Sequence, residues 1–520
     1  MPDEAVGGGD ESTPVTLGEV LRIDDVVSVA RGAPVRFGES ARSRIAASRA
    51  VVERAMSSGA VVYGVTTGFG SLADVVLAPE DAAALQHGLL RSHAVAVGPE
   101  LSDEEVRAML ALRAHVLALG YSGVRFEVAQ RFVEMLELGI LPLVPEQGSL
   151  GASGDLAPLA HLALGAVGEG RCRFGGEVVP ARTALERTGL EPIELVAKEG
   201  LALINGTQGM TAIGALAAAR GRTLAKSADI AAALSVEGIL GTDRAFDLRV
   251  VGLRPHPGQQ ASAENLLRLL AGSGILASHL DSHHVVQDAY SIRCVPQVHG
   301  AFRDVLTNTI RTLELEFASV SDNPIVLPDD DEILSCGNFH GQPVANACDS
   351  LAAASVGLAS ISERRLYRLL DPKTSNGLPP FLVPRAGINS GFMVCQYTAA
   401  SLVSESKSIA HPAAVDSITS SAGQEDHVSM GMIAARHARE CVRNAEMVVA
   451  LEVLAAAQAC DMRSPLLPSV ATAAAVAAVR EVVAPLLHDR ELKPDVDAAI
   501  ELVSSGALVR AVEREIGALR

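Results

Sequence analysis

The sequence predicts a mainly α-helical protein, a long-helix bundle with a glycine-rich N-terminal portion. The 520-residue chain is 48% hydrophobic with only 3% aromatic residues and no Trp, so its core is expected to be aliphatic. After about residue 220, long proline-free stretches carry apolar residues at helical spacing. Before that point, short apolar pieces alternate with Gly, Ser, Thr and Asn, a pattern typical of irregular backbone that carries functional residues.

The elements follow in chain order. Residues 1–14, MPDEAVGGGDESTP, predict a disordered acidic tail and lack the basic and apolar regions of a signal peptide. The capping box SDEE at 102–105 predicts the start of an amphipathic helix that is closed by Gly120. Three further long helices are expected between Pro296 and Pro324, at 344–371, and within 412–465 with breaks near Gly423 and Gly431.

No Pro- or Ser-rich linker divides the chain, so we expect one fused core. Its N-terminal portion covers 15–220 and carries the candidate site, and its helical bundle portion covers 221–520. The seven cysteines are odd in number and scattered without a CxxC pair, which predicts reduced, mostly buried thiols.

Charge and hydropathy restrict the partners. The chain has 61 acidic and 43 basic residues and a formal charge of -18, which repels nucleic-acid phosphates and anionic lipids. The apolar runs are interrupted by charge or Gly before the roughly 20 residues that span a bilayer. We therefore expect a cytoplasmic protein without a nucleic-acid or membrane partner.

The most unusual local sequence is GSLGASGDL at 148–156. One interpretation is a Gly/Ser turn capped before a helix at 156–164. The other starts from Ala152-Ser153-Gly154, in which the Gly amide nitrogen, unhindered by a Cβ, can attack the Ala carbonyl if a tight fold presses them together. Loss of water closes an imidazolone ring, and dehydration of Ser153 leaves an exocyclic methylene. Such a group is an electrophile that no ordinary side chain supplies.

The stretch GSLGASGDLAPLAH resembles the signature of the aromatic amino acid ammonia-lyases and aminomutases, in which this tripeptide becomes 4-methylideneimidazol-5-one (MIO). Further motifs resemble that family in the same order: YGVTTGFG at 63–70, LALINGTQG at 201–209, QDAYSIRC at 287–294, GNFHGQP at 337–343, GLPPFLV at 377–383 and QEDHVSMG at 424–431. Within the family the pattern is most similar to the histidine ammonia-lyases. The resemblance implies a fumarase/aspartase-like superfamily architecture, an MIO formed from Ala152, Ser153 and Gly154 with no external cofactor, and a homotetramer whose active sites are shared between subunits.

The resemblance implies roles around the MIO for four residues. Tyr63 is the base that takes the β-proton of the substrate, and Tyr290 lies on the MIO side of the site. Asn205 hydrogen-bonds the MIO oxygen, and Phe339 lies beside the ring. Taken singly, these residues have ordinary explanations, because an isolated aromatic residue packs in a core and an Asn-Gly pair is a turn signal.

Four residues are implied in substrate binding. Arg293 is the carboxylate clamp, since a guanidinium offers two parallel donors to a planar anion, and Gln287 precedes it in the same motif. His93 stands where Ser-His resembles the histidine-specific members. Glu425 supplies a carboxylate that can pair with an imidazole but is costly beside a phenyl ring. A lone Arg or Glu is more often a surface charge, so these roles depend on the resemblance.

The resulting hypothesis is conversion of L-histidine to trans-urocanate and ammonia. The alternatives are a tyrosine 2,3-aminomutase, which tends to have Asn-Gln-Asp at Gln424-Glu425-Asp426, and a tyrosine or phenylalanine ammonia-lyase. A non-catalytic helical scaffold is disfavoured because the tripeptide occurs together with the other motif residues. A fumarase-type lyase would need a GSSxMPxKxN loop that is missing from the sequence. No metal is expected, because the adjacent His283 and His284 cannot easily face one ion.

Overall fold

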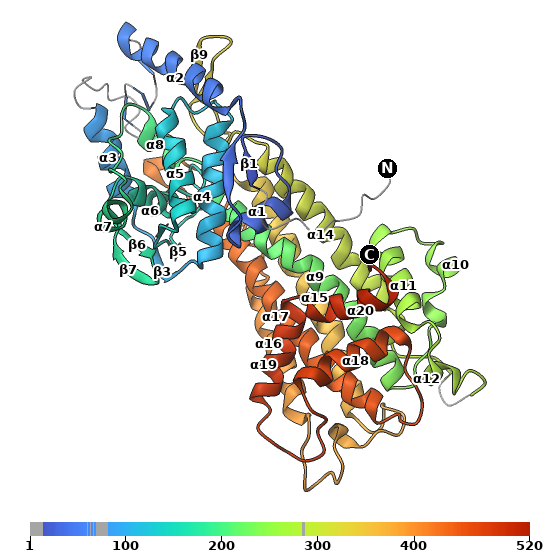
Figure 1. The fold of residues 1–520 in the computed structure, drawn as a ribbon. Helices are drawn as coiled ribbons and strands as arrows, with labels where there is room; N and C mark the ends of the chain where they lie inside the picture. The colour runs from blue at the N-terminus through green and yellow to red at the C-terminus, as the bar shows by residue number, and fades with distance from the viewer. Residues whose placement is uncertain (1–13, 60, 63, 66, 69–81, 283–285) are drawn as a thin grey trace. The chain divides into compact units, whose positions relative to one another are not determined.

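The computed structural model describes residues 14–59, 61–62, 64–65, 67–68, 82–282 and 286–520. These residues contain twenty α-helices and nine short strands (Figure 1). The predicted mainly α-helical class is therefore confirmed.

The chain forms two compact units, each assembled from three segments. Unit 1 comprises Met1–Leu216, Ile310–Cys348 and Pro412–Arg436, and unit 2 comprises Ala217–Thr309, Asp349–His411 and His437–Arg520. Four of the five borders between these segments fall within long helices, α9 (Gln208–Gly238), α14 (Val295–Phe317), α15 (Gln342–Leu370) and α17 (Gly431–Asp461), and the fifth follows α16 (Met393–Ile409) at His411. The division into portions at residue 220 stays a prediction.

Unit 1 holds eight further helices and all of the described strands. The helices are α1 (Ile23–Ala30), α2 (Ala41–Ser58), α3 (Ala82–His93), α4 (Asp103–Ala118), α5 (Phe126–Leu138), α6 (Leu156–Ala166), α7 (Ala181–Thr188) and α8 (Glu199–Ile204). Strands β1 (Val15–Leu17) and β2 (Val35–Phe37) form a parallel pair. The other three sheets are antiparallel: β3 (Val97–Glu100) pairs with β5 (Pro145–Gln147), and β8 (Ile325–Leu327) pairs with β9 (Glu332–Leu334). In the third, β6 (Arg171–Phe174) lies between β4 (Leu141–Pro142) and β7 (Glu177–Pro180).

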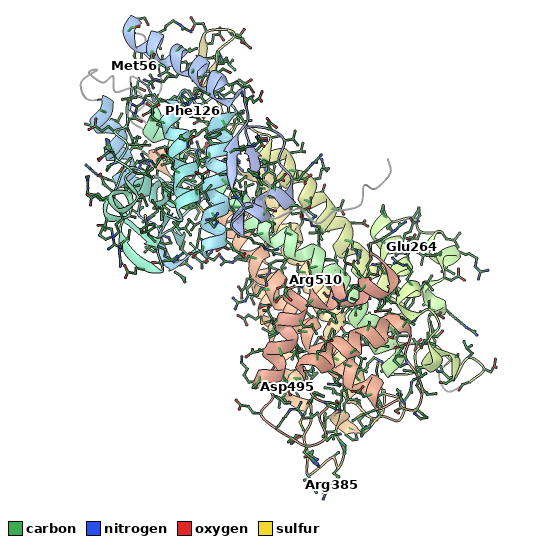
Figure 2. The ribbon with its side chains drawn as sticks, viewed as in Figure 1. Met56, Phe126, Glu264, Arg385, Asp495 and Arg510 are labelled. Atoms are coloured by element: carbon green, nitrogen blue, oxygen red, sulfur yellow. The ribbon has the colours of Figure 1, made fainter. Side chains whose placement is uncertain are left out.

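Helix α4 lies at the centre of unit 1 and begins at the predicted capping box. Glu105 donates its backbone N–H to Ser102 Oγ at 3.3 Å, and Glu105 Oε2 accepts from Ser102 N at 2.8 Å. Nearly all of its side chains are buried, because α1, α2 and α5 pack around it. Phe126, labelled in Figure 2, stands at the start of α5. Its ring packs edge-on against Phe37 of β2, with ring centroids 5.4 Å apart.

Unit 2 consists of helices and loops, with no named strand among its described residues. In addition to its parts of the four long helices it contains α10 (Leu248–Val251), α11 (Pro257–Leu270), α12 (Gly274–Ala277), α13 (Tyr290–Arg293), α16 (Met393–Ile409), α18 (Val470–Val482), α19 (Lys493–Ser504) and α20 (Ala507–Ile516). A buried polar network joins its long helices. Arg365 donates to Glu452 Oε2 at 2.7 Å, and His299 Nδ1 lies 2.7 Å from Asp229 Oδ1.

The long helices agree with prediction except in one stretch. Helices α14 and α15 occupy the expected regions, and α17 starts at Gly431, where a break was expected. Residues 412–430 contain no α-helix, and Ser421 and Ala422 within them adopt left-handed backbone conformations, with φ of 50° and 54°, which an α-helix does not admit.

The cysteines are in the state that the sequence predicts. All seven cysteines are free thiols and five are buried, as predicted.

Helix α15 is long and apolar enough to cross a membrane by length and composition, although the sequence predicts no such run. Because 61% of its apolar window is buried, as in the core helix of a folded domain, this is weak support for a membrane span.

Candidate active site

The Ala152-Ser153-Gly154 tripeptide forms a tight turn between β5 and α6. Ser153 and Gly154 both have positive φ, 51° and 78°, and Gly154 N donates to Gly151 O at 3.3 Å. A Cβ at position 154 would lie 2.1 Å from the carbonyl oxygen of Gly206, so only Gly fits there. The turn therefore has the compactness and the unhindered Gly nitrogen that cyclisation requires, and these residues fit an MIO.

The C-terminal end of α8 meets this turn. Gly206 N donates to Ser153 O at 3.1 Å, and Gly206 O accepts from Asp155 N at 2.7 Å. Arg113, fully buried on α4, holds the end of α8 by donating to the carbonyl of Ala202 and, at 2.8 Å, to that of Asn205. Burial lowers the pKa of Arg113 to about 10, with the charge of Asp322 opposing this shift, so the guanidinium stays charged at neutral pH.

The side chain of Asn205 is buried at the same end of α8. Its Nδ2 donates to Asp322 Oδ1 at 3.2 Å and to the carbonyl of Asn323 at 2.8 Å. Its Oδ1 is buried and has no hydrogen-bond partner among the described residues. A buried polar atom without a partner requires an explanation, and a bound ligand group or an ordered water supplies one. The expected bond from Asn205 to the MIO oxygen stays a prediction, because both amide N–H groups point to other acceptors here.

Asp155 connects the turn to the first residues of α9. Its Oδ2 accepts from Met210 N at 2.7 Å and its Oδ1 from Ser149 Oγ at 3.0 Å. Burial raises the pKa of Asp155 to about 7, although both hydrogen bonds oppose that rise. Asp155 therefore caps α9 with a carboxyl group that titrates near neutral pH.

The motifs at 337–343 and 424–431 reach the same turn. Met430 N donates to the carbonyl of Leu150 at 3.0 Å, and a Cβ at Gly151 would lie 2.4 Å from Ser429 Oγ. His340 Nε2 lies 3.3 Å from the carbonyl of His427, and the two imidazole rings stack with centroids 5.8 Å apart. Motifs 201–209 and 424–431 thus contact the turn directly, and motif 337–343 adjoins it through His427 and Ser429.

The convergence brings Phe339 and Glu425 into this part of unit 1. Phe339 is half-buried and precedes His340 in the stacked pair. Glu425 is also half-buried, and its Oε2 is buried without a hydrogen-bond partner among the described residues. Burial raises the pKa of Glu425, because the charged form is less well solvated.

His93 ends α3, and the residues after it pack against the same region. His93 is half-buried, its Nδ1 lies 2.9 Å from the carbonyl of Leu89, and burial lowers its pKa. Ala96 donates its N–H to His161 Nε2 at 3.2 Å, and a Cβ at Gly148 would lie 3.2 Å from Ala96 Cα. His93 therefore precedes by three residues Ala96, which contacts the loop of residues 148–154.

Gln287, Tyr290 and Arg293 form a second group, in unit 2. The Arg293 Cζ lies 4.4 Å from the centroid of the Tyr290 ring, an arrangement typical of a cation–π contact. With its amide oxygen directed toward the guanidinium, Gln287 accepts from Arg293 Nη2 at 3.0 Å. Tyr290 is 70% exposed. The three side chains thus form one surface cluster.

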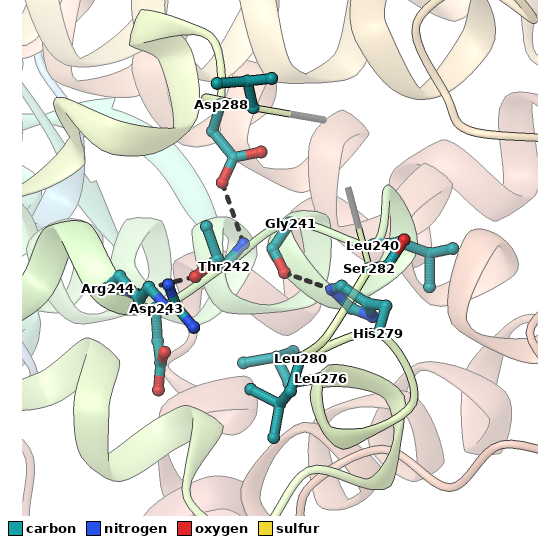
Figure 3. A pocket seen from close by; sticks show the side chains of 11 residues that line it. Leu240, Gly241, Thr242, Asp243, Arg244, Leu276, His279, Leu280, Ser282 and Asp288 are labelled. Atoms are coloured by element: carbon teal, nitrogen blue, oxygen red, sulfur yellow. Dashed lines mark hydrogen bonds between the residues drawn. The ribbon is translucent and has the colours of Figure 1, made fainter. Parts of the chain in front are cut away.

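The segment that carries this cluster is anchored beside a pocket of about 120 Å³ (Figure 3). Asp288 Oδ2 accepts from the backbone N of Thr242 at 2.9 Å, and His279 Nε2 lies 2.9 Å from the carbonyl of Gly241. Both contacts attach the segment to the loop that follows α9.

The structure therefore divides the predicted residues between the units. Unit 1 contains His93, Ala152, Ser153, Gly154, Asn205, Phe339 and Glu425, and unit 2 contains Gln287, Tyr290 and Arg293. Tyr63 lies outside the described residues.

Sequence reasoning missed three buried charges next to the turn: Arg113, Lys198 and Asp322. Arg113 occurs within an apolar helix, and Lys198 stands directly before the apolar run of α8. A charge in an apolar run is the signal that could have found Arg113 and Lys198, because charged side chains are buried only when they have partners, and no such signal marks Asp322.

The model for the aromatic amino acid lyase family matches residues 21–481. The chain belongs to the aromatic amino acid lyase family. A histidine ammonia-lyase from Sorangium cellulosum is 53% identical over 512 residues, which cover 97% of this chain and 99% of the relative. The crystal structure of histidine ammonia-lyase from Trypanosoma cruzi matches with a TM-score of 0.90 and 42% identity, covering 97% of this chain and 96% of that one.

The tyrosine aminomutase from Streptomyces globisporus matches equally well in fold. Its TM-score is 0.92 at 38% identity, covering 98% of this chain and 100% of that one. Because a lyase and an aminomutase of this family share one fold, the fold leaves the reaction open, and the residues that face the substrate must decide it. The family depends on an MIO formed from its own chain.

Proposed function

We propose that this family member is a histidine ammonia-lyase, which eliminates ammonia from L-histidine to give trans-urocanate. The observation that carries the proposal is the meeting of three other motifs at the turn of residues 148–154, two by direct hydrogen bonds and one through His427, with a buried, unpartnered carboxylate oxygen of Glu425 on one of them. Curated relatives about 50% identical over nearly the whole chain are histidine ammonia-lyases, which supports the same reaction.

The proposed MIO forms from Ala152, Ser153 and Gly154 without an external cofactor. Once formed, this group supplies an electrophilic methylene that makes the substrate amine a better leaving group. Asn205 and Phe339 would hold the ring. The bonds between Gly206 and residues 153 and 155 fix the turn. Electrostatic preorganisation of this kind is commonly the largest contribution to catalysis.

The substrate is oriented by charge at both ends. Arg293, assisted by Gln287, binds the carboxylate of L-histidine, and Glu425 and His93 face its imidazole. A buried carboxylate would be left unpaired by a phenyl ring, so the pocket selects against phenylalanine. Tyr63 takes the β-proton, and Tyr290 lies on the MIO side of the site.

We also propose a cytoplasmic homotetramer that draws each active site from more than one subunit and has no nucleic-acid or membrane partner. The division of the predicted residues between two units is compatible with this assembly.

A substrate panel tests the function. L-histidine, L-tyrosine and L-phenylalanine are supplied separately, and the products are identified by near-UV absorbance and mass spectrometry. We expect urocanate and equimolar ammonia from histidine and little turnover of the other two. A β-amino acid product would establish an aminomutase, and faster turnover of tyrosine or phenylalanine would overturn the histidine assignment.

A further inference from the structure

A pair of opposite charges is buried next to Asn205. Lys198 Nζ donates to Asp322 Oδ2 at 2.9 Å, and both side chains are 0% exposed. Lys198 immediately precedes α8, in a left-handed conformation with φ of 70°. A buried ion pair is weak support for stability, because the cost of desolvating two charges offsets their attraction. The other contacts of this pair indicate a different role.

Asp322 determines the orientation of the Asn205 amide. Its second oxygen, Oδ1, accepts from Asn205 Nδ2 at 3.2 Å and from Asn323 N at 2.7 Å. Asn205 Nδ2 also donates to the Asn323 carbonyl at 2.8 Å, so both amide protons are engaged. A flipped amide would set its oxygen against these two acceptors, and the present orientation is therefore fixed. The amide oxygen is left on the other side, buried and unpartnered among the described residues.

The orientation matters because Asn205 is joined directly to the turn. The next residue, Gly206, donates to the carbonyl of Ser153 at 3.1 Å and accepts from Asp155 N at 2.7 Å. Asp322 contacts Asn205, and the next residue, Gly206, makes both hydrogen bonds to the tripeptide region. A change at Asp322 therefore acts close to these two bonds.

We propose, on the basis of the function proposed above, that Asp322 and Lys198 are positioning residues for the reaction. Asp322 fixes the side chain of Asn205, whose neighbour Gly206 carries the two hydrogen bonds to the tripeptide region. Lys198 balances the charge of the Asp322 carboxylate within the protein interior. The pair is thus retained for the geometry of Asn205 and not for stability.

Two matched double variants separate these roles. Lys198→Met with Asp322→Asn removes both charges but keeps an acceptor for Asn205. Lys198→Met with Asp322→Leu removes the charges and the acceptor. Both remove the two charges of the pair together, so neither is left alone, and the buried Arg113 loses the opposing charge of Asp322 equally in the two variants. The measurements are the thermal midpoint, the intact mass, which reports the fraction of subunits that have lost two waters, and kcat and KM per dehydrated subunit.

We expect similar thermal midpoints for the two variants. The Asn variant should keep kcat within about tenfold of wild type, and the Leu variant should lose roughly 100-fold in kcat or fail to dehydrate, because a misplaced group near the reacting atoms has effects of this size. Equal kcat and equal dehydration in the two variants would overturn the proposal.

If the Leu variant does not fold, the Asn variant alone tests the proposal. A loss of about 100-fold in kcat or loss of dehydration at a normal thermal midpoint would contradict the proposal, since the acceptor is still present. Failure of the function itself is distinguishable, because wild-type enzyme in the same series would then not convert histidine, while intact mass would still report the effect on the turn.

Discussion

The proposed chemistry depends on the hydroxyl group of Ser153, which is lost when the methylene forms. Ser153→Ala keeps the backbone of the turn but has no hydroxyl to lose, so the methylene cannot form. We expect a normal circular dichroism spectrum and thermal midpoint and a loss of at least about 1,000-fold in kcat, the size typical of removing an essential catalytic group. Wild-type activity retained in this variant would remove Ser153 from the mechanism.

A second prediction for a single residue concerns Glu425 and the choice of substrate. Its Oε2 is buried and unpartnered among the described residues, and we assign it to the imidazole of the substrate. Glu425→Gln keeps the size of the side chain but weakens this interaction, so kcat/KM for histidine should fall by about 100-fold or more. Intact mass should show the same loss of water as in wild type. Unchanged histidine turnover would exclude Glu425 as the imidazole partner.

At the scale of elements, α9 is capped by a carboxyl group with a raised pKa. Burial raises the pKa of Asp155 to about 7 in the folded protein, against about 3.9 in an unfolded chain. Between these values the folded state holds a proton that the unfolded state has lost. The contribution of Asp155 to stability is therefore full below about pH 4 and is lost as the pH rises through 7, by up to about 1.4 kcal/mol per pH unit.

Asp155→Asn provides the matched comparison, because an amide keeps an acceptor for Met210 but does not titrate. The stability of wild type relative to this variant should fall as the pH is raised from 5 to about 7 and should then level off. Thermal unfolding at a series of pH values measures this difference. A difference that does not vary with pH would show that Asp155 does not titrate in this range.

Elements also show what could be predicted from the sequence. The capping box at Ser102 and the helical spacing of α14 and α15 are local signals, and local signals are readable without a structure. The resemblance supplied the site residues, and three of its other motifs do meet at the turn, one of them through His427. The pair of Lys198 and Asp322 could not be predicted, because its partners are 124 positions apart and only the fold brings them together.

At the scale of the whole molecule, the predicted residues lie in two units of the chain. If active sites are shared between subunits, Ser153 and Arg293 of one site come from different chains. Arg293→Ala should mainly weaken substrate binding, and Ser153→Ala should be inactive. Co-expressed chains that carry one change each would then form some sites in which both residues are intact. Activity well above the sum of the two separate variants is expected, in a tetramer verified by light scattering.

Mixed tetramers without such recovery would show that one chain supplies both residues. A stable, active monomer would contradict the shared site altogether.

The central claim is that the tight turn at Ala152-Ser153-Gly154 becomes the electrophile of the reaction. Intact-protein mass spectrometry of the active wild-type enzyme, followed by peptide mapping, tests it most directly. Ring closure and dehydration of Ser153 each release one water, so the account predicts a mass two waters below that of the translated sequence, with the loss located in the peptide that contains residues 152–154. A fully active enzyme at the unmodified mass would contradict it.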